Sequence, residues 1–215
     1  ITGFAELLKK PNLNAEMKNK YVTIINNSSQ TLLNLIDDII DISKIEAGEI
    51  RLNQKEVHIR ELLIDLHTLY NRIKHEKKRP RTEIRLNMPP LDHSPVIMTD
   101  PHRLRQILNN LINNALKFTE NGSVEFGYNI RKGSIEFFVK DTGIGIQQDK
   151  QDLIFTRFKQ VDETIARKYG GTGLGLAISK GLVELLDGKI WLKSRPAKGT
   201  TFYFTIPYVK SEHPK

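Results

Sequence analysis

Cysteine is absent from this chain of 215 residues, which excludes disulfide bonds and metal sites built from thiolates. Long apolar runs are missing as well. The most apolar stretch, LLNLIDDIIDI, is interrupted by aspartates at 37, 38 and 41, whereas a membrane-spanning helix needs roughly 18 consecutive apolar residues. We therefore expect these residues to make no membrane contact. Because the chain begins with Ile1 and not with Met, we interpret it as a piece of a longer protein.

Aromatic residues are scarce, at 7% of the sequence. This matters because the formal charge of +8 suggests a nucleic-acid partner, and proteins that bind single strands combine basic residues with aromatic ones. The densest basic cluster, RIKHEKKRPR at 72–81, contains no aromatic residue. We interpret this cluster as a solvated turn, or as an attractor of an anionic ligand or an acidic partner, and we predict no nucleic-acid binding.

What the sequence does contain begins with a long amphipathic pattern between Ala15 and Ala47. Its apolar residues recur at helical spacing, at Ile25, Leu32, Leu35, Ile36, Ile39, Ile42 and Ile45. The spacing predicts a long helix with a narrow apolar stripe, which needs a partner helix. The preceding ITGFAELLKK also has a helical pattern, PNLN interrupts it, and Asn14 is a suitable N-cap for the second helix.

Residues 1–50 are therefore predicted to form an antiparallel helical hairpin, with Gly48 as a C-cap. The first helix is too short to cover the second. We expect both that more of the first helix lies upstream and that a second copy of the hairpin packs against this one.

From residue 51 onward the pattern changes to shorter elements. We predict a helix over Ile59–Glu76, strands near Thr82–Met88 and Val96–Thr99, and a helix that begins at Pro101, since proline is favoured in a first turn. SVEFGYNI and SIEFFVKD alternate as strands do, with Ile135, Phe137 and Val139 on one face, and a short turn joins them as a hairpin.

The last part of the chain combines helices with two more strands. QDLIFTRF is predicted as a short helix, followed by a polar stretch over Lys159–Gly170, a glycine-led helix that ends near Leu186, and the strands KIWLKS and TTFYFTI. Runs of strands whose helices must cover one face predict an α+β two-layer sandwich with a mixed, mainly antiparallel sheet. We assign residues 51–210 to this domain and residues 211–215 to a tail.

Glycines gather in KYGGTGLGLAIS, at the start of the last predicted helix. Gly171, Gly173 and Gly175 follow a G-x-G-x-G spacing, which differs from the G-x-G-x-x-G of dinucleotide folds and lacks the Lys-Ser/Thr pair of a P-loop. Bare backbone N–H groups at a helix N-terminus form an anion site, for which phosphate is the natural ligand. A glycine-rich turn without a ligand would produce the same pattern.

A second glycine turn, DTGIGI, follows a predicted strand. Asp141 ends that strand, and Gly143 and Gly145 bend the chain after it. The pattern fits an aspartate that stabilises a turn. It also fits a carboxylate that accepts a hydrogen bond from the exocyclic amine of a base such as adenine.

Two amides and a lysine share one face of the predicted helix NNLINNALKFT. Asn110, Asn114 and Lys117 lie at i, i+4 and i+7. Amide oxygens can complete the coordination of a Mg²⁺ ion that is otherwise held by water and phosphates, and the lysine can neutralise phosphate charge. An isolated pair of asparagines is usually surface decoration, but this pair is one of three such elements.

Together these motifs resemble the catalytic ATP-binding domain of the sensor histidine kinases, in the wider group that includes gyrase, heat-shock chaperones and mismatch-repair ATPases. NNLINNALKFT looks like the N box, DTGIGI the first glycine box, IFTRFKQVD the phenylalanine box and GGTGLGLAI the second glycine box, and KGTTFYFTIP resembles the closing strand. Their order and spacing match over about Glu56–Pro207. The resemblance implies a Bergerat-type fold that binds ATP with Mg²⁺.

The same resemblance implies roles for individual residues. Asp141 would bind the adenine amine, with Gly143 and Gly145 beside the base. Asn114, together with Asn110, would bind Mg²⁺.

The phosphate end of the nucleotide is assigned in the same way. Lys117 would contact phosphate, and Arg157 is a weaker candidate for that role. A mobile lid over Gln147–Gly170 would close over the triphosphate, anchored by the packing of Phe155 and Phe158. The remaining residues that would serve this lid or contact the nucleotide are Gly171, Thr172, Gly173, Leu174, Gly175 and Thr200.

One departure from the ATP-hydrolysing relatives bears on the reaction. In those relatives a glutamate one turn before the magnesium asparagine acts as general base, and this chain has Asn110 there. An amide cannot take up a proton, which favours phosphoryl transfer over hydrolysis. The resemblance thus implies a protein-histidine kinase in the parent protein. A regulatory module that binds nucleotide without phosphotransfer, and an ATP-hydrolysing relative, remain as alternatives.

The hairpin, which ends in IDDIIDISKIEAG, resembles the dimerisation and histidine phosphotransfer element of hybrid-type sensor kinases. In that family the phosphoacceptor histidine lies about three helical turns before the glycine that matches Gly3. We therefore expect it upstream of Ile1 and expect no autophosphorylation by the chain itself. The resemblance also implies a homodimer, transfer to a receiver-domain aspartate of a response regulator, and a cytoplasmic core whose bacterial parent is anchored in the inner membrane.

Overall fold

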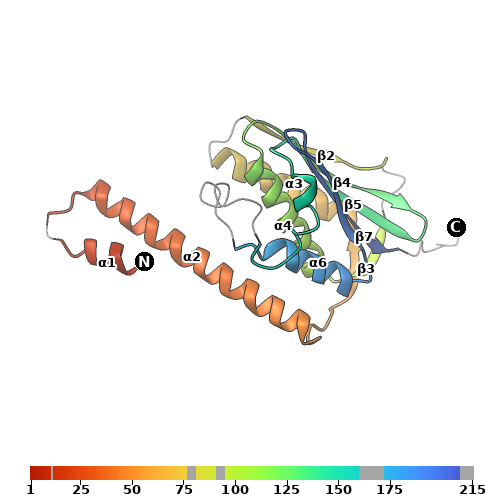
Figure 1. Cartoon of the computed structure of the whole chain (residues 1–215), viewed down its shortest axis with the longest axis horizontal. Helices are drawn as coiled ribbons and strands as arrows, with labels where there is room; N and C mark the ends of the chain where they lie inside the picture. The colour runs from red at the N-terminus through yellow and green to blue at the C-terminus, as the bar shows by residue number, and fades with distance from the viewer. Residues whose placement is uncertain (11, 77–80, 91–94, 160–171, 209–215) are drawn as a thin grey trace.

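The computed structural model describes residues 1–10, 12–76, 81–90, 95–159 and 172–208. A helical hairpin projects from a layered α+β domain (Figure 1). None of the helices in this described part is long and apolar enough to cross a lipid bilayer. The predicted order, a hairpin followed by an α+β sandwich, is confirmed.

The hairpin contains a short helix, α1 (Thr2–Leu7), and a long one, α2 (Ala15–Glu46). The two helices run in opposite directions, and the rings of Phe4 and Tyr21 lie with centroids 5.5 Å apart. Asn14 caps α2 as expected, because its side-chain oxygen accepts a hydrogen bond at 2.8 Å from a backbone N–H of the first turn. Helix α1 ends at Leu7 and is therefore shorter than the sequence pattern predicts.

Helix α2 ends at Glu46, two residues before the predicted glycine. Gly48 has a φ of +65°, in the left-handed region that glycine adopts without strain. The backbone N–H groups of Gly48 and Glu49 donate to the carbonyl oxygens of Ile45 and Lys44 at 3.1 and 2.9 Å. These bonds satisfy carbonyl groups of the last helical turn.

The second domain is built on a five-stranded sheet in the order β2-β4-β5-β7-β6. In that order the strands span Thr82–Asn87, Gly122–Arg131, Ser134–Asp141, Gly199–Pro207 and Ile190–Arg195. Strands β2 and β4 pair in parallel, whereas the other neighbours pair antiparallel. A separate antiparallel ribbon joins β1 (Lys55–His58) to β3 (Val96–Thr99). The large sheet is thus mixed and mainly antiparallel, as predicted.

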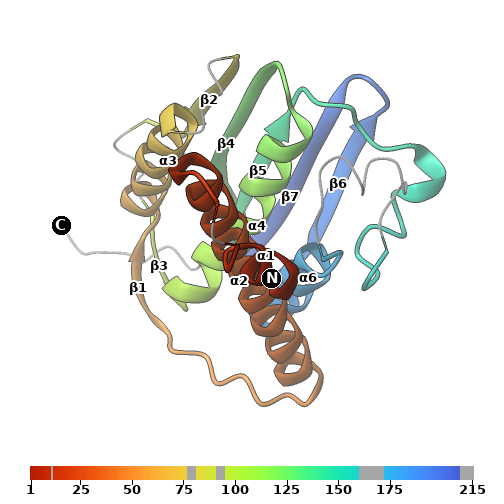
Figure 2. The same cartoon turned by 90° about the vertical axis from the view of Figure 1, so that its left-hand side faces the viewer.

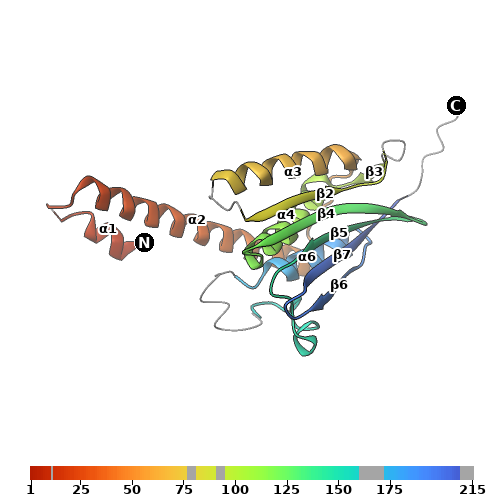
Figure 3. The ribbon, with the colours of Figure 1, turned by 90° about the horizontal axis from the view of Figure 1, so that it is seen from above.

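Helices α3 (Ile59–Glu76), α4 (Pro101–Phe118) and α6 (Gly175–Leu185) lie side by side on one face of the sheet (Figure 2). Seen from above, α2 leads away from this layered domain (Figure 3). The helices bury their apolar stripes against the sheet. The C-terminus of α4 packs on the turn after β5, and the start of α6 packs on α4.

The core lies between the sheet and these helices. Ile135, Phe137 and Val139 are fully buried, which confirms the predicted alternation along β5. The ring of Phe137 stacks on that of Phe204 from β7, with centroids 4.7 Å apart. This packing holds the inner strands β5 and β7 together, and Asp141, which is described below, lies at the end of β5.

Two further features of the structure differ from what the sequence predicts. The sequence pattern does not predict strand β1. The expected helix QDLIFTRF is wrong, because residues 151–158 form successive turns after a short 3₁₀ helix, η1 (Gln148–Lys150). The Gln151 side chain donates to the carbonyl oxygens of Ile146 and Ser194 at 3.0 and 3.2 Å, and these bonds hold the segment as a loop. So short a segment also gains little from helix formation alone.

Candidate functional site

Helix α4 carries the three predicted polar residues, Asn110, Asn114 and Lys117, and each is half-buried. Asn110 contacts α6: its Nδ2 donates to the carbonyl oxygen of Gly175 at 3.2 Å and to the hydroxyl of Ser179 at 3.4 Å. Asn110 therefore joins α4 to the first turn of α6, and its amide oxygen is the atom left to bind a cation.

Asn114 and Lys117 continue this face toward the C-terminus of α4. The side chain of Asn114 makes no hydrogen bond to any residue that the structure describes. The Lys117 Nζ lies 4.9 Å from the centroid of the Phe118 ring. Burial lowers the pKa of Lys117 below its ordinary value, because the charged ammonium group loses hydration. An anion beside this ammonium would offset that loss.

Asp141, at the end of β5, is 5% exposed. Its Oδ1 accepts hydrogen bonds from the backbone N–H groups of Gly143 at 2.8 Å and Thr200 at 3.3 Å. Its Oδ2 has no partner within the described ranges. Burial raises the pKa of Asp141 above its ordinary value of 3.8, and the two backbone hydrogen bonds oppose this rise. One oxygen of a buried carboxylate is thus open to a donor from a ligand.

Close backbone packing requires the two glycines that follow Asp141. A Cβ at Gly143 would lie 2.3 Å from the carbonyl oxygen of Phe118, so this turn packs directly on the end of α4. Gly145 has a φ of +69°, and a Cβ there would lie 2.0 Å from the carbonyl oxygen of Arg195. The contact of Gly143 brings the first glycine box and the N box together, as the motifs predict, and the contact of Gly145 places the same loop against the end of β6.

The second glycine turn leads into α6. Gly173 has a φ of +72°, and a Cβ there would lie 3.1 Å from the Cα of Phe158. The Thr172 hydroxyl accepts a hydrogen bond from the backbone N–H of the buried Leu174 at 3.2 Å. No side chain caps α6, so its first backbone N–H groups, from Gly175 on, are available to an anion.

Of the two expected lid anchors, Phe155 is in place and Phe158 is not. Phe155 is half-buried and meets the ring of Phe202 edge-on, with centroids 6.4 Å apart. Phe158 is 68% exposed, so the prediction that its ring anchors the lid by packing is wrong for this conformation. The reason is local, since Phe158 has a left-handed backbone with φ of +57° and bonds the glycine turn through its main chain.

Arg157, the weaker phosphate candidate, forms an ion pair with Glu46 of α2. Gly171 and residues 160–170 of the predicted lid lie outside the described residues. The expected phosphate contacts of Arg157 and of the lid stay predictions.

Two residues that shape the site were not anticipated. The Ser194 hydroxyl accepts a hydrogen bond from the backbone N–H of Ile146 at 2.8 Å and lies 2.9 Å from the Thr200 hydroxyl. Ser194 thereby fastens the first glycine loop to strands β6 and β7. Gly199 has a φ of +85°, and a Cβ there would lie 2.0 Å from the carbonyl oxygen of Asp141. Gly199 begins β7 directly after the turn between the last two strands, and a glycine next to a turn is a signal in the sequence. A serine within a strand carries no such signal.

Within the ranges that the structure describes, no group of three or more His, Asp or Glu side chains could hold a metal ion. A cation at this site would therefore depend on the amide oxygens of α4 and on ligands supplied by a bound phosphate or by water. This donor set suits Mg²⁺, which usually keeps several waters.

Comparison with known protein families gives two matches. The family described as "Histidine kinase-, DNA gyrase B-, and HSP90-like ATPase" matches residues 99–210. The "His Kinase A (phospho-acceptor) domain" matches residues 1–48. The first match contains all the site residues described above, and the second contains the hairpin.

Individual relatives are similar along nearly the whole chain. The autoinducer 2 sensor kinase/phosphatase LuxQ of Vibrio vulnificus (strain CMCP6) is 41% identical over 99% of this chain and 25% of its own length. The signal transduction histidine-protein kinase BarA of Escherichia coli (strain K12) is 38% identical over 96% of this chain and 22% of its own length. The chain thus spans about a quarter of the length of these relatives.

A solved structure shows the same arrangement. The crystal structure of full-length ShkA in complex with AMPPNP has a TM-score of 0.77 and 35% sequence identity to this chain, and the match covers 96% of this chain and 42% of ShkA.

Proposed function

Because this chain belongs to the sensor histidine kinase family, we propose that it is a kinase core that binds Mg-ATP. In the longer parent protein, the γ-phosphoryl group passes from ATP to a histidine and then to an aspartate of a response regulator. One observation carries this proposal: three groups converge at the end of strand β5. They are the carboxylate of Asp141, the uncapped N-terminus of α6 and the amide-bearing helix α4.

We place the nucleotide in this site with its adenine at Asp141 and its phosphates at α6. The adenine amine donates to the Oδ2 of Asp141, the oxygen that lacks a partner among the described residues. The phosphates lie at the N-terminus of α6, where the helix dipole and free N–H groups favour negative charge. Lys117, which is half-buried, adds positive charge on the same side.

Magnesium suits the residues present. Asn114 offers an amide oxygen that is free of protein partners in the described ranges, and the oxygen of Asn110 lies one turn earlier. When bound, Mg²⁺ neutralises phosphate charge and orients the triphosphate. Asn110 and Asn114 hold the ion, and the contact from Asn110 to Gly175 keeps α6 in register with that position.

Phosphoryl transfer is favoured over hydrolysis by the chemistry of Asn110. A general base must take up a proton from water, and an amide cannot. Its Nδ2 is also committed to α6 as a hydrogen-bond donor. We therefore expect slow steady-state hydrolysis, so that the nucleotide is kept for another acceptor.

The hairpin supports a homodimer as the functional assembly. Six large apolar side chains of α2 are 43–55% exposed, namely Val22, Leu32, Leu33, Ile36, Ile39 and Ile40. An apolar stripe of this kind is characteristic of a helix that packs against other helices. A second hairpin would cover it, in a cytoplasmic core of a membrane-anchored parent that delivers the phosphoryl group to a receiver domain.

Calorimetric titration of the chain with AMP-PNP tests the proposal, with and without Mg²⁺. We expect saturable binding with one site per chain and a marked gain in affinity when Mg²⁺ is present. In parallel, steady phosphate release from ATP should be slow. A folded chain that binds no nucleotide would contradict the proposal, and rapid release would favour the ATP-hydrolysing alternative.

A further inference from the structure

Helix α2 is docked against the nucleotide-binding domain through its C-terminal half (Figure 1). Asp38, Asp41 and Ile45 lie at i, i+3 and i+7, on one face of the helix. Each of them contacts a different part of the catalytic domain. This face is separate from the exposed apolar stripe assigned above to dimerisation.

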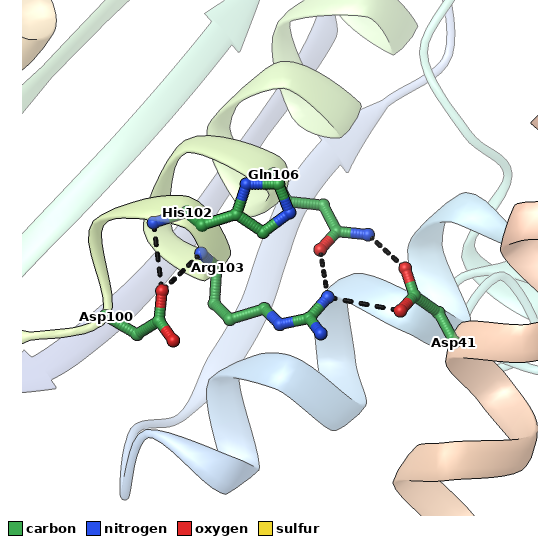
Figure 4. Close-up of polar contacts among 5 residues, drawn as sticks. All are labelled: Asp41, Asp100, His102, Arg103 and Gln106. Carbon is green, nitrogen blue, oxygen red and sulfur yellow. Dashed lines mark hydrogen bonds and ion pairs between the residues drawn. The ribbon is translucent and has the colours of Figure 1, made fainter. Parts of the chain in front are cut away.

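Asp41 anchors the contact. Its Oδ1 pairs with Arg103 Nη1 at 3.1 Å, and its Oδ2 accepts from Gln106 Nε2 at 2.6 Å, while the same Arg103 nitrogen donates to Gln106 at 2.9 Å (Figure 4). The side chains of Asp41 and Arg103 are only 19% and 18% exposed. Gln106 lies one turn before Asn110 on α4, so the anchor and the magnesium ligands share one helix.

Asp38 reaches the second glycine turn. Its Oδ2 accepts a hydrogen bond from the Thr172 hydroxyl at 3.0 Å, although the two residues are 134 positions apart in the sequence. A threonine hydroxyl has one hydrogen to donate. While Asp38 holds that hydrogen, Thr172 cannot donate to a phosphate oxygen at the N-terminus of α6.

Glu46, which follows Ile45 directly and ends α2, pairs with Arg157, the arginine that the sequence marks as a phosphate candidate. Three carboxylates of α2 therefore contact the catalytic domain. Asp38 and Glu46 bind Thr172 and Arg157, which are candidate phosphate ligands. Asp41 binds residues of α4 that lie one to two turns before Asn110. Between Asp41 and Glu46, Ile45 packs so closely on α6 that a Cβ at Gly181 would lie 2.8 Å from Ile45 Cγ2.

We propose that this acidic face of α2 is a latch that occupies donors of the nucleotide site, so that docking of the hairpin and binding of Mg-ATP oppose each other. The inference rests on the proposed function, because it concerns regulation of that same site. The triphosphate and the α2 carboxylates compete for the same two donors, the hydroxyl of Thr172 and the guanidinium of Arg157.

Repulsion between carboxylates acts in the same direction at Asp38. Burial raises the pKa of Asp38, the hydrogen bond from Thr172 opposes this rise, and the nearby charges of Asp41 and Asp37 raise the pKa further. A phosphate that approached Thr172 would add another negative charge beside Asp38. The groove of about 480 Å³ between α2 and α4 is lined by carboxylates and cations together, among them Asp37, Asp41, Lys44, Arg103 and Arg105, so the groove as a whole does not repel a phosphate.

The opposition is reciprocal, because any two ligands of one protein that disfavour each other do so by the same factor. Bound nucleotide should therefore loosen the docked hairpin, and release of the hairpin should tighten nucleotide binding. In a kinase core, this loosening would allow the catalytic domain to move along the hairpin once the domain has bound ATP.

Two variants release the latch by different means. Asp38→Ala removes the acceptor that holds the hydrogen of the Thr172 hydroxyl, and Gly181→Leu places a large side chain against Ile45 and so moves α2 away from α6 without a change in charge. The matched control is Glu16→Ala, which removes one carboxylate from the exposed first turn of the same helix. Calorimetric titration of the full chain with Mg-AMP-PNP should give Kd values at least about threefold lower for the two latch variants than for wild type, with no change for the control.

Spin labels give an independent measure of docking, since the chain has no native cysteine. Labels on Asn27→Cys in α2 and Glu184→Cys in α6, both exposed positions, should report a distance distribution that broadens or shifts when Mg-AMP-PNP is added.

The outcomes separate the latch from the proposed function. Unchanged or weaker affinity in both latch variants, or an unchanged label distance on saturation, overturns the latch while nucleotide binding by wild type stands. If neither wild type nor any variant binds the nucleotide, the proposed function fails and the latch fails with it.

Discussion

Replacement of Asp141 by asparagine should remove tight nucleotide binding without a loss of stability. The Oδ1 of Asp141 accepts hydrogen bonds from the backbone N–H groups of Gly143 and Thr200 at 2.8 and 3.3 Å. In the Asp141→Asn variant the amide oxygen must stay at that place to keep both bonds. The amide nitrogen then takes the place of Oδ2, so that a donor faces the adenine amine, which is also a donor.

The size of the binding defect follows from this geometry. A hydrogen bond to a charged group contributes about 1.5–3 kcal/mol, and a buried donor left unpaired costs about 1–3 kcal/mol. Their combination gives a loss of roughly 3 kcal/mol, or about 150-fold in Kd.

The effect on stability has the opposite sign. Burial raises the pKa of Asp141 above 3.8 in the folded chain, so the ionised carboxylate opposes folding at neutral pH. The contribution of such a group to stability is greatest below its unfolded pKa and is lost as the pH rises through the folded pKa. Asp141→Asn should therefore be as stable as wild type or more stable at pH 7, and the difference should shrink as the pH falls toward 4.

Titration with two nucleotides, combined with thermal unfolding, checks this reasoning. Wild type should prefer ATP to inosine triphosphate, whose base carries an acceptor in place of the amine. The Asp141→Asn variant should lose or reverse that preference, because its amide nitrogen can donate to this acceptor. A folded variant that keeps both wild-type affinity for ATP and wild-type preference would refute the assignment of Asp141 to the adenine amine.

Three further predictions concern the metal, the glycine loop and the core. Asn114→Ala should make nucleotide affinity nearly independent of Mg²⁺ in calorimetry, and a retained dependence would show that other ligands hold the ion. Gly145→Ala should lower the free energy of unfolding in urea by roughly 1–3 kcal/mol more than Gly133→Ala does. Both glycines have a positive φ, but of the two only Gly145 would place a Cβ against a backbone oxygen, that of Arg195, at 2.0 Å. Equal losses in the two variants would contradict this packing. Phe137→Ala, at a fully buried stacked ring, should lower the free energy of unfolding by about 3–5 kcal/mol, and a loss under about 1 kcal/mol would contradict its place in the core.

Much of the fold could be predicted because its signals are local. The helical spacing of α2, the cap at Asn14 and the proline at the start of α4 each lie within a few residues of what they determine. Strand β1 was missed for the same reason. It has four residues, of which only Val57 is buried, so no alternation marks it, and its pairing with β3 depends on residues some forty positions away.

The site divides in the same way. Motif spacing placed Asp141 and Asn114 correctly on the end of a strand and on a helix, because each motif is a short run. The tertiary contacts of the motifs could not be predicted. The hydrogen bond between Asp38 and Thr172 is one such contact. The prediction that Phe158 packs against the domain was wrong for the same reason. Hydrogen bonds between distant segments depend on the way that the hairpin docks, which no local pattern records.

The most direct test of the central claim is to incubate the intact parent protein with Mg²⁺ and ATP that is radiolabelled on its γ-phosphate. The account predicts label on the protein that survives alkali and is lost in acid, as a phosphohistidine would be, while the present chain alone releases little phosphate. An intact parent that binds ATP but carries no such label would contradict the kinase assignment and leave a nucleotide-binding module without phosphotransfer.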